Sequence, residues 1–270
     1  MRHYDKDNNR LVYLSGTASP SDWDERWSRS AFEKLFIPER NAWLVAETRR
    51  YLPVGSAVLE GGCGCADKVY SLKAAGYRAF GFDTAQKTLY RALEVCPDLN
   101  IAVGDIRSLP LIDGAMDGYW SLGVFEHFQE GMQAQWQEAS RVIRGGGYLF
   151  LTVPIMSPLR RLKARLNVYP LLTEVPEGRF YQYAYSPQAI MSAAEANGFV
   201  LVSARLFDGI KGLKDEVRIL RPALQRLYDS KTMIARILRR VVDVGCRAFS
   251  GHMGYFVFRR VNAQAAKDGR

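Results

Sequence analysis

One short stretch restricts the fold of this chain more than any other. Residues 57–59 form a short apolar run typical of a buried parallel strand, and the acidic Glu60 ends it. Residues 61–64 then contain three glycines. From Asp67 the apolar residues recur at helical spacing until Gly76, which closes the helix. Strand, glycine turn and helix in this order predict the nucleotide-binding opening of a doubly wound α/β fold.

The glycine turn suits a ligand that comes close to the backbone. Glycines leave the chain accessible, and the free amides at the helix start favour a negatively charged group. Counted from Gly62, the pyridine-nucleotide fingerprint G-x-G-x-x-G would require a glycine where Asp67 stands. No Gly-Lys-Ser/Thr sequence ends the turn, so it is not a phosphate loop.

Two more acids stand at the ends of predicted strands. The second strand ends at Asp83, 23 residues after Glu60. A carboxylate in this place can accept hydrogen bonds from both ribose hydroxyls of an adenosine. Thr84 is predicted to cap the next helix, and the third strand, residues 100–105, ends at Asp105.

Together these residues resemble the class I S-adenosylmethionine (SAM)-dependent methyltransferases. The first motif of that family reads acid-x-G-x-G-x-G; Glu60, Gly62 and Gly64 match it, and Ala66 takes the third glycine place. The resemblance implies that SAM is the cofactor, that Asp105 pairs with the adenine amino group and that Ile106 packs on the ring. The residues expected to bind SAM are Glu60, Gly61, Gly62, Cys63, Gly64, Asp83, Thr84, Asp105, Ile106, Ser121 and Leu122.

The candidate catalytic residues follow the predicted fourth strand. Residues 109–127 resemble the stretch that leads into this strand in small-molecule methyltransferases, and its carboxyl end is where open α/β sheets bind ligands. Glu126 and His127 come next, beside the expected position of the sulfonium methyl group. With an unperturbed pKa near 6.5, His127 can act as a general base, and Glu126 can orient it or bind substrate. In many members of the resembled family this Glu-His pair helps to shape the site while deprotonation occurs elsewhere. Both a catalytic and a structural role of the pair therefore stay open.

The resemblance implies an α/β architecture: a Rossmann-like, doubly wound, mostly parallel seven-stranded sheet whose last strand is antiparallel. We expect N-terminal helices to lie over the cofactor, and residues 1–20 to lack regular structure. The predicted parts are an N-terminal helical cap (1–54), the SAM-binding core (55–153), a substrate lid or insertion without a strand (154–185), and the C-terminal part of the same domain (186–262) with a helical insertion (211–250).

Two helices in the second half are basic or amphipathic. Residues 158–168 predict a helix whose arginines and lysine face solvent, an anionic lipid or a phosphate-bearing substrate. The apolar stripe at residues 234–242 predicts a helix that docks on its own domain, with membrane contact as the alternative. Ser186, Pro187 and Gly198 predict the bounds of another helix.

Composition and sequence patterns restrict the cellular compartment expected for this protein. The chain has 270 residues and a net charge of +9, and no apolar run approaches the roughly 18 residues of a membrane span. The N-terminus lacks a secretory pattern, and four scattered cysteines do not make a disulfide framework. No Cys/His pair completes a metal site with Cys63 and Cys65, so no metal is expected. A cytoplasmic protein is predicted, with peripheral contact at the inner membrane face through the basic helices as the alternative.

The predicted function is methyl transfer from SAM to a small-molecule, glycan or lipid-linked acceptor, at oxygen. The amino-methylating signature Asp/Asn-Pro-Pro-aromatic is missing after the fourth strand, where residues 121–124 read Ser-Leu-Gly-Val. Two alternatives are an RNA methyltransferase and a non-catalytic SAM-binding protein. The positive charge permits nucleic-acid binding, but no RNA-binding module is visible. The sequence makes no prediction of the oligomeric state.

Overall fold

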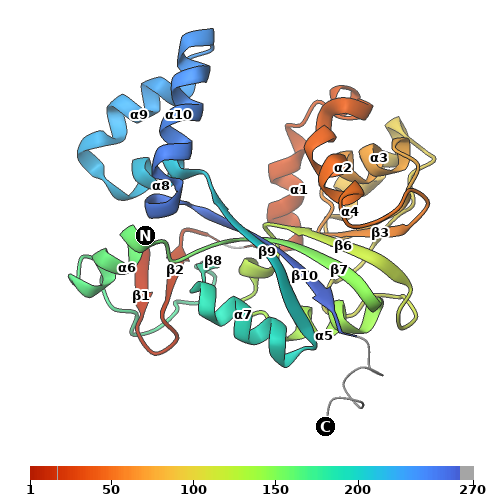
Figure 1. Ribbon diagram of the computed structural model, residues 1–270, viewed down its shortest axis with the longest axis horizontal. Helices are drawn as coiled ribbons and strands as arrows, with labels where there is room; N and C mark the ends of the chain where they lie inside the picture. Colours follow the sequence, from red (N-terminus) through yellow and green to blue (C-terminus); the bar gives the residue numbers. More distant parts are fainter. Residues whose placement is uncertain (17, 262–270) are drawn as a thin grey trace.

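A seven-stranded sheet forms the centre of the molecule (Figure 1). The computed structural model describes residues 1–16 and 18–261. The strands of the sheet are β3 (Ala57–Gly61), β4 (Arg78–Asp83), β5 (Ile101–Val103), β6 (Met116–Leu122), β7 (Ile143–Pro154), β9 (Phe199–Phe207) and β10 (Met253–Arg260). Their order is β5-β4-β3-β6-β7-β10-β9, and β10 alone runs antiparallel to its neighbours. The predicted Rossmann-like sheet with its antiparallel last strand is confirmed.

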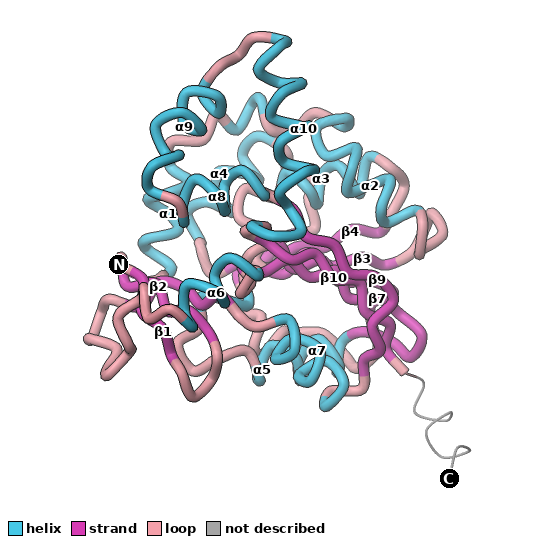
Figure 2. The backbone as a smooth tube through the Cα atoms, turned by 60° about the vertical axis from the view of Figure 1, so that its left-hand side comes forward, coloured by secondary structure: helices cyan, strands magenta, loops and turns pink. Residues whose placement is uncertain are grey.

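Helices cover both faces of this sheet (Figure 2). They are α2 (Ala42–Arg49), α3 (Asp67–Ala74) and α4 (Gln86–Val95) on one face, and α5 (Gln133–Val142) and α7 (Pro187–Ala196) on the other. Side chains alternate between the two faces of a strand. Val58 and Trp120 therefore pack with α2, α3 and α4, whereas Leu59 and Tyr119 pack with α5 and α7. Burial on both faces explains why β3 begins with a continuous apolar run, Ala57 to Leu59, and does not alternate with polar residues.

The turn after β3 adopts left-handed backbone conformations at all three motif positions. Gly62 and Gly64 have φ of +74° and +50°, and a Cβ on Gly62 would lie 2.5 Å from the Val124 side chain. Ala66, in the third glycine place, has φ of +60°. For a residue other than glycine this conformation costs roughly 1–2 kcal/mol. The departure from the glycine motif therefore leaves the shape of the turn unchanged and adds local strain.

The N-terminal residues differ from the prediction. Instead of lacking regular structure, they form β1 (Arg2–Asp5) and β2 (Arg10–Leu14), and β2 pairs with β8 (Phe180–Ala184) in a second, three-stranded sheet. The helical cap predicted for residues 1–54 is thus wrong at its start, and the insertion at 154–185 does contain a strand. β2 and β8 lie far apart in the sequence, and strand formation depends more on such partners than on intrinsic propensity.

The remainder of the N-terminal cap is helical. It comprises α1 (Pro20–Ser28), the short 3₁₀ helices η1 (Phe32–Lys34) and η2 (Pro38–Asn41), and α2. Ser19 caps α1: its hydroxyl accepts from the N–H of Asp22, and the Asp22 carboxylate accepts from the N–H of Ser19. The helix therefore begins at Pro20, directly after this cap.

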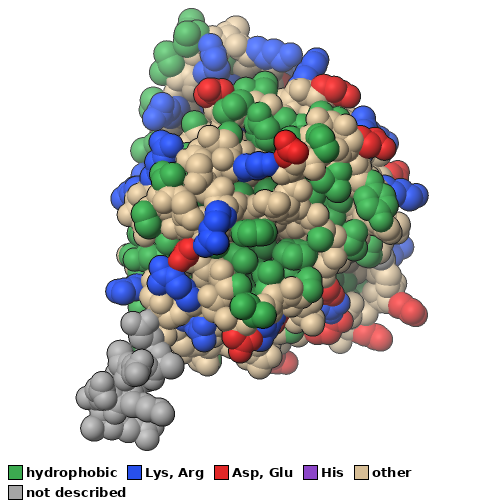
Figure 3. All heavy atoms as spheres, turned by 90° about the vertical axis from the view of Figure 1, so that its right-hand side faces the viewer, with side chains coloured by type: hydrophobic (Ala, Val, Ile, Leu, Met, Phe, Trp, Pro, Cys, Tyr) green, Lys and Arg blue, Asp and Glu red, His purple; other side chains and the backbone are tan. Residues whose placement is uncertain are grey.

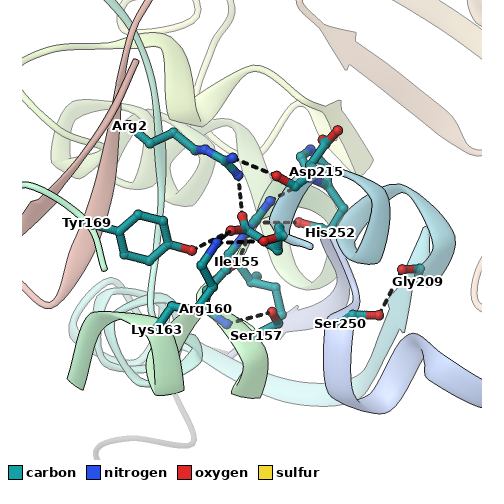
Figure 4. Close-up of polar contacts among 11 residues, drawn as sticks. Arg2, Ile155, Ser157, Arg160, Lys163, Tyr169, Gly209, Asp215, Ser250 and His252 are labelled. Atoms are coloured by element: carbon teal, nitrogen blue, oxygen red, sulfur yellow. Dashed lines mark hydrogen bonds and ion pairs between the residues drawn. The ribbon is translucent and has the colours of Figure 1, made fainter. Parts of the chain in front are cut away.

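The basic helix is oriented differently from the prediction. The Arg160 side chain in α6 (Pro158–Arg165) is fully buried. Leu162, in the same helix, is 46% exposed, and Leu166, which follows the helix, is 65% exposed. Lys163 donates to the Glu216 carboxylate at the end of α8 (Gly209–Glu216). The prediction of a solvent-facing basic surface is wrong for these two residues because the later insertion supplies a buried carboxylate (Figure 4).

The insertion between β9 and β10 stands away from the sheet (Figure 1). It contains α8, η4 (Arg218–Leu220), α9 (Arg221–Asp229) and α10 (Met233–Ser250). The helix at residues 234–242 was predicted to dock on its own domain. α10 does pack on α8, α6 and β9, but not through its apolar stripe, since Ile234, Ile237 and Val241 are largely exposed. No helix in the described ranges is long and apolar enough to cross a membrane. Residue 262, the predicted end of the C-terminal part, lies outside the described residues.

Candidate active site

A cavity of about 400 Å³ opens where β4, β5 and β6 end. Parallel strands bring their carboxyl ends to one edge of the sheet, which is why residues from three separate turns meet there. Of the residues predicted from the sequence, Gly62, Asp83, Thr84, Asp105, Ile106, Leu122 and His127 line the cavity. The others, Glu60, Gly61, Cys63, Gly64, Ser121 and Glu126, do not line it.

Asp83 is held at the cavity wall by backbone donors. Its Oδ2 accepts from the N–H of Gly64 at 2.7 Å, and its Oδ1 accepts from the N–H of Ala85 at 2.8 Å. Burial raises the pKa of this carboxyl, and the two N–H groups act in the opposite direction. Ala85, not Thr84, is the residue that precedes α4 at the cap position, so the cap predicted for Thr84 is wrong. The Asp83 carboxylate satisfies the Ala85 amide that a Thr84 cap would have left free.

Asp105 is paired with Arg107, which no sequence motif indicated as a site residue. Its carboxylate accepts from the Arg107 guanidinium through both oxygens: Oδ2 lies 2.7 Å from Nη2 and 3.0 Å from Nε, and Oδ1 lies 3.1 Å from Nε. Burial would raise the pKa of Asp105, but the Arg107 hydrogen bonds outweigh it and lower that pKa. Arg107 also lines the cavity and packs over the Phe128 ring. Ile106, between the two, is buried and contributes an apolar wall.

Several of the predicted residues are buried near the cavity and do not line it. Glu60 is buried at the end of β3, with the Lys68 Nζ at 3.7 Å from Oε1 and no hydrogen-bond partner for Oε2 among the described residues. Burial raises the pKa of Glu60 to about 8. Cys63 packs against β4, where its Sγ would lie 2.9 Å from a Cβ on Gly81. These buried residues support the glycine turn without lining the cavity.

Helix α1 forms the opposite wall. Trp23 and Trp27 line the cavity, and a Cβ on Gly64 would lie 3.2 Å from the Trp27 ring. Asp24 fastens α1 to α4 by accepting from the backbone N–H of Thr88 at 2.8 Å and from its hydroxyl at 2.7 Å. The sequence indicated N-terminal helices near the cofactor, but nothing in their spacing distinguished these tryptophans from ordinary core residues.

His127 lies in the cavity wall as a neutral imidazole. Its Nδ1 is 2.7 Å from the backbone carbonyl oxygen of Tyr181, and since a carbonyl only accepts, Nδ1 carries the proton. The lone pair is therefore on Nε2. The rings of Trp23 and Tyr181 each lie 4.9 Å from the imidazole. Burial lowers the pKa of His127 to about 4, and the nearby Arg26 contributes in the same direction.

This environment predicts the titration of His127. Its imidazole proton resonances should shift with a midpoint near pH 4 instead of near 6.5. Because the pKa is lower in the folded than in the unfolded state, folding loses stability as pH falls from about 6.5 towards 4. Proton NMR from pH 3 to 8, with the signal assigned by its loss in His127→Gln, measures the midpoint. A midpoint between 6 and 7 would mean that the ring is solvated.

Glu126 does not face the cavity. It is buried in the 3₁₀ turn η3 (Phe125–His127), its Oε2 has no hydrogen-bond partner in the described ranges, and burial raises its pKa to about 8. The structure therefore does not bring the two predicted catalytic residues to one surface. The carbonyl of Tyr181, and not Glu126, orients the His127 ring.

Comparison with known proteins finds a matching family model for the part of the chain that forms this site. Residues 59–151 match the family model described as a methyltransferase domain. An uncharacterized 37.1 kDa protein in transposon TN4556 of Streptomyces fradiae is 34% identical over 106 residues, which are 37% of this chain and 30% of that protein. The chain thus spans less than a third of that relative's length.

Solved structures share the fold over most of the chain. A Galdieria sulphuraria protein assigned as a sarcosine dimethylglycine methyltransferase has a TM-score of 0.51 and 19% identity, covering 93% of this chain and 92% of its own. An S-adenosylmethionine-dependent methyltransferase from Mesorhizobium loti has a TM-score of 0.51 and 18% identity, covering 83% and 98%. The cyclase SpnF has a TM-score of 0.53 and 17% identity, covering 93% and 89%.

The sheet order, the cavity at the strand ends and the match over residues 59–151 agree with one another. Residues 59–151 therefore form a methyltransferase domain, on the fold shared by SAM-dependent methyltransferases.

Proposed function

We propose that this protein transfers a methyl group from SAM to an oxygen of a small-molecule, glycan or lipid-intermediate acceptor. The observation that carries the proposal is the cavity, which combines the strand-end carboxylates Asp83 and Asp105 with the neutral imidazole of His127. Its volume of about 400 Å³ lies within the range of roughly 300–1,000 Å³ usual for small-molecule sites.

The residues of the cavity fit SAM. The Asp83 carboxylate, fixed by two backbone amides, can accept from two adjacent ribose hydroxyls. Ile106 and Leu122 offer apolar surfaces for the adenine ring, and Asp105 can accept from its amino group while it shares Arg107. Gly62, whose Cβ would be blocked by Val124, leaves room at the turn for the backbone to approach the ligand.

His127 lines this cavity with a neutral imidazole, whose Nε2 can accept a proton. When bound, SAM supplies an electrophilic methyl group, which the acceptor oxygen takes in one displacement that leaves S-adenosylhomocysteine. The hydroxyl proton passes to Nε2 of His127, whose ring is oriented by the Tyr181 carbonyl. A pKa near 4 makes the imidazole a weak base, but that is enough because the hydroxyl becomes strongly acidic as its oxygen is methylated. Trp23 and Tyr181 beside the ring keep water away.

The alternatives predict other outcomes. A SAM-binding protein without methyl transfer would share the fold, as the cyclase SpnF does. An RNA methyltransferase would bind RNA tightly and in a salt-sensitive manner. The cavity does not favour an RNA acceptor, because aromatic residues line it beside His127 and its arginine, Arg107, is paired with Asp105.

The test is an acceptor screen with methyl-labelled SAM. The protein would be incubated with panels of phenols, hydroxylated glycans, lipid intermediates and RNA, and products would be identified by mass spectrometry and NMR. O-methyl products, with kcat lowered roughly a hundredfold or more in His127→Gln at unchanged affinity for S-adenosylhomocysteine, would support the proposal. N- or C-methyl products alone would overturn the oxygen acceptor. Binding of SAM without any transfer would overturn the enzymatic function.

A further inference from the structure

The outward face of α10 is apolar along the whole helix. Ile234, Ile237, Leu238, Val241, Val244 and Phe249 expose between 47% and 79% of their surfaces. Spacings of three and four relate the first five of these residues, and Phe249 lies eleven residues, or about three turns, after Leu238, so all six share one face. A contiguous apolar surface of this kind marks an interaction site on a protein surface.

The packing of α10 fixes this orientation. The helix turns its small and polar residues inwards: Ala235 and Ser250 are buried, and Ser250 donates to the Gly209 carbonyl at 2.8 Å. The Asp243 carboxylate accepts from the N–H of Ile210 at 3.1 Å. A Cβ on Gly209 would lie 2.7 Å from the Arg247 backbone, so α8 and α10 touch closely at this glycine. Rotating α10 to bury its apolar stripe would break these contacts.

Arginines run along one edge of the stripe. The helical period places Arg236 and Arg240 on adjacent turns and Arg247 about two turns further on, along one side of the apolar face. All are exposed, and none has an ion-pair partner within residues 1–16 and 18–261. Residues 217–250 contain eight arginines and lysines but two aspartates, so much of the net charge of +9 is here. Figure 3 shows basic and hydrophobic side chains together at the top of the molecule, where Figure 1 places the end of α10.

We propose that α10 is a membrane-docking helix that lies in the interface of an anionic lipid bilayer. Its apolar stripe would enter the boundary between headgroups and acyl chains, and the arginines along its edge would bind lipid phosphates. An apolar face beside a basic edge, without the length or hydropathy of a span, is the pattern of such interfacial helices. A second copy of this chain is a poorer occupant, because it would leave the arginines without an anionic partner and, in an antiparallel twofold pair, would set the two basic edges side by side.

Helix α10 leads into the sheet at the same edge at which the cavity opens. β10 begins directly after α10, and its first residue, Met253, pairs with Pro154 at the carboxyl end of β7. The cavity opens at the carboxyl ends of the parallel strands β4 to β6. Docking through α10 would therefore turn this edge towards the bilayer. This orientation favours a lipid-borne acceptor over the small-molecule and glycan acceptors named above. The inference rests on the proposed methyl transfer.

The test is co-sedimentation of the full chain with vesicles. The chain should pellet with mixed phosphatidylglycerol and phosphatidylcholine vesicles, bind phosphatidylcholine alone at least roughly tenfold more weakly, and be released by high salt. Ile237→Asp/Val241→Asp should lose binding to the mixed vesicles by roughly tenfold or more. Arg236→Glu/Arg240→Glu should do the same. These side chains are exposed, so the variants should stay folded.

Matched controls make the result specific. Ile112→Asp, at an 81% exposed isoleucine outside the insertion, and Lys34→Glu, on η1, should bind vesicles like the unaltered chain. Absence of binding by the folded chain would overturn the proposal. So would a dimer in analytical ultracentrifugation that Ile237→Asp/Val241→Asp converts to monomer, since the stripe would then bind a second copy. Calorimetry with S-adenosylhomocysteine on the same samples reports the cofactor site separately from docking.

Discussion

Replacing Asp83 by alanine should weaken the binding of S-adenosylhomocysteine by roughly a hundredfold or more. In the proposed site the carboxylate accepts from both ribose hydroxyls, and hydrogen bonds to a charged group contribute about 1.5–3 kcal/mol each. The same carboxylate holds the N–H groups of Gly64 and Ala85, so its loss also frees the glycine turn. Isothermal titration calorimetry of the purified protein measures the change in dissociation constant.

Two variants calibrate this result. Asp83→Asn keeps the side chain's shape and one acceptor oxygen but loses the charge, so its affinity should fall between those of the alanine variant and the unaltered protein. Asp113→Ala removes a carboxylate that is 82% exposed and lies outside the cavity, and it should bind normally. If Asp83→Ala, with its fold intact by circular dichroism, bound as tightly as the unaltered protein, Asp83 would not be part of the cofactor site.

Glu216→Gln should lower the free energy of unfolding by about 3–5 kcal/mol, a loss typical of breaking a buried ion pair from one side. Glu216 is buried and is the acceptor for Arg160 at 3.0 Å, Lys163 at 2.7 Å and Tyr169 at 2.6 Å, and it also binds Arg2. The amide would leave three cations without a balancing charge. Thermal unfolding followed by circular dichroism should show a melting temperature lower by roughly 10 °C.

The pH dependence distinguishes a lost charge from poorer packing. Burial would raise the pKa of Glu216, but Arg2 and Arg160 overcome it and lower that pKa. A carboxyl whose pKa is lowered by folding stabilises the protein above its unfolded pKa of about 4.3, and this stability is lost as pH falls through the folded value. The difference between the unaltered protein and Glu216→Gln should therefore be largest near pH 7 and shrink below about pH 4. A difference that did not change with pH would indicate a packing defect instead.

The neighbouring Asp215 is the matched control for this cluster. It sits beside Glu216 on α8, and its carboxylate is 3.9 Å from Nδ1 of His252. That ring accepts a hydrogen bond from Arg160 at Nδ1, and burial lowers the pKa of His252 to about 2, so the imidazole is neutral and the contact is not an ion pair. Asp215→Asn should change stability by less than about 0.5 kcal/mol.

The sequence by itself determined the core of the methyltransferase domain. β4 ends at Asp83 as predicted, and Ser186 and Pro187 begin α7 as expected. These features depend on local rules: glycine conformations, capping hydroxyls, fixed proline dihedrals and the two-residue period of strands. The strand-end positions of Asp83 and Asp105 followed from the same rules, because parallel strands end at one edge.

Only the tertiary structure decided the features that depend on partners distant in the chain. β2 exists because it pairs with β8, and Arg160 is buried because Glu216 meets it from the insertion. α10 has the amphipathic pattern of a helix that docks on its own domain, yet it packs through its small and polar face. Periodicity states which residues share a face but not which face the rest of the protein covers. That choice is made by close contacts such as the one at Gly209, which no local pattern encodes.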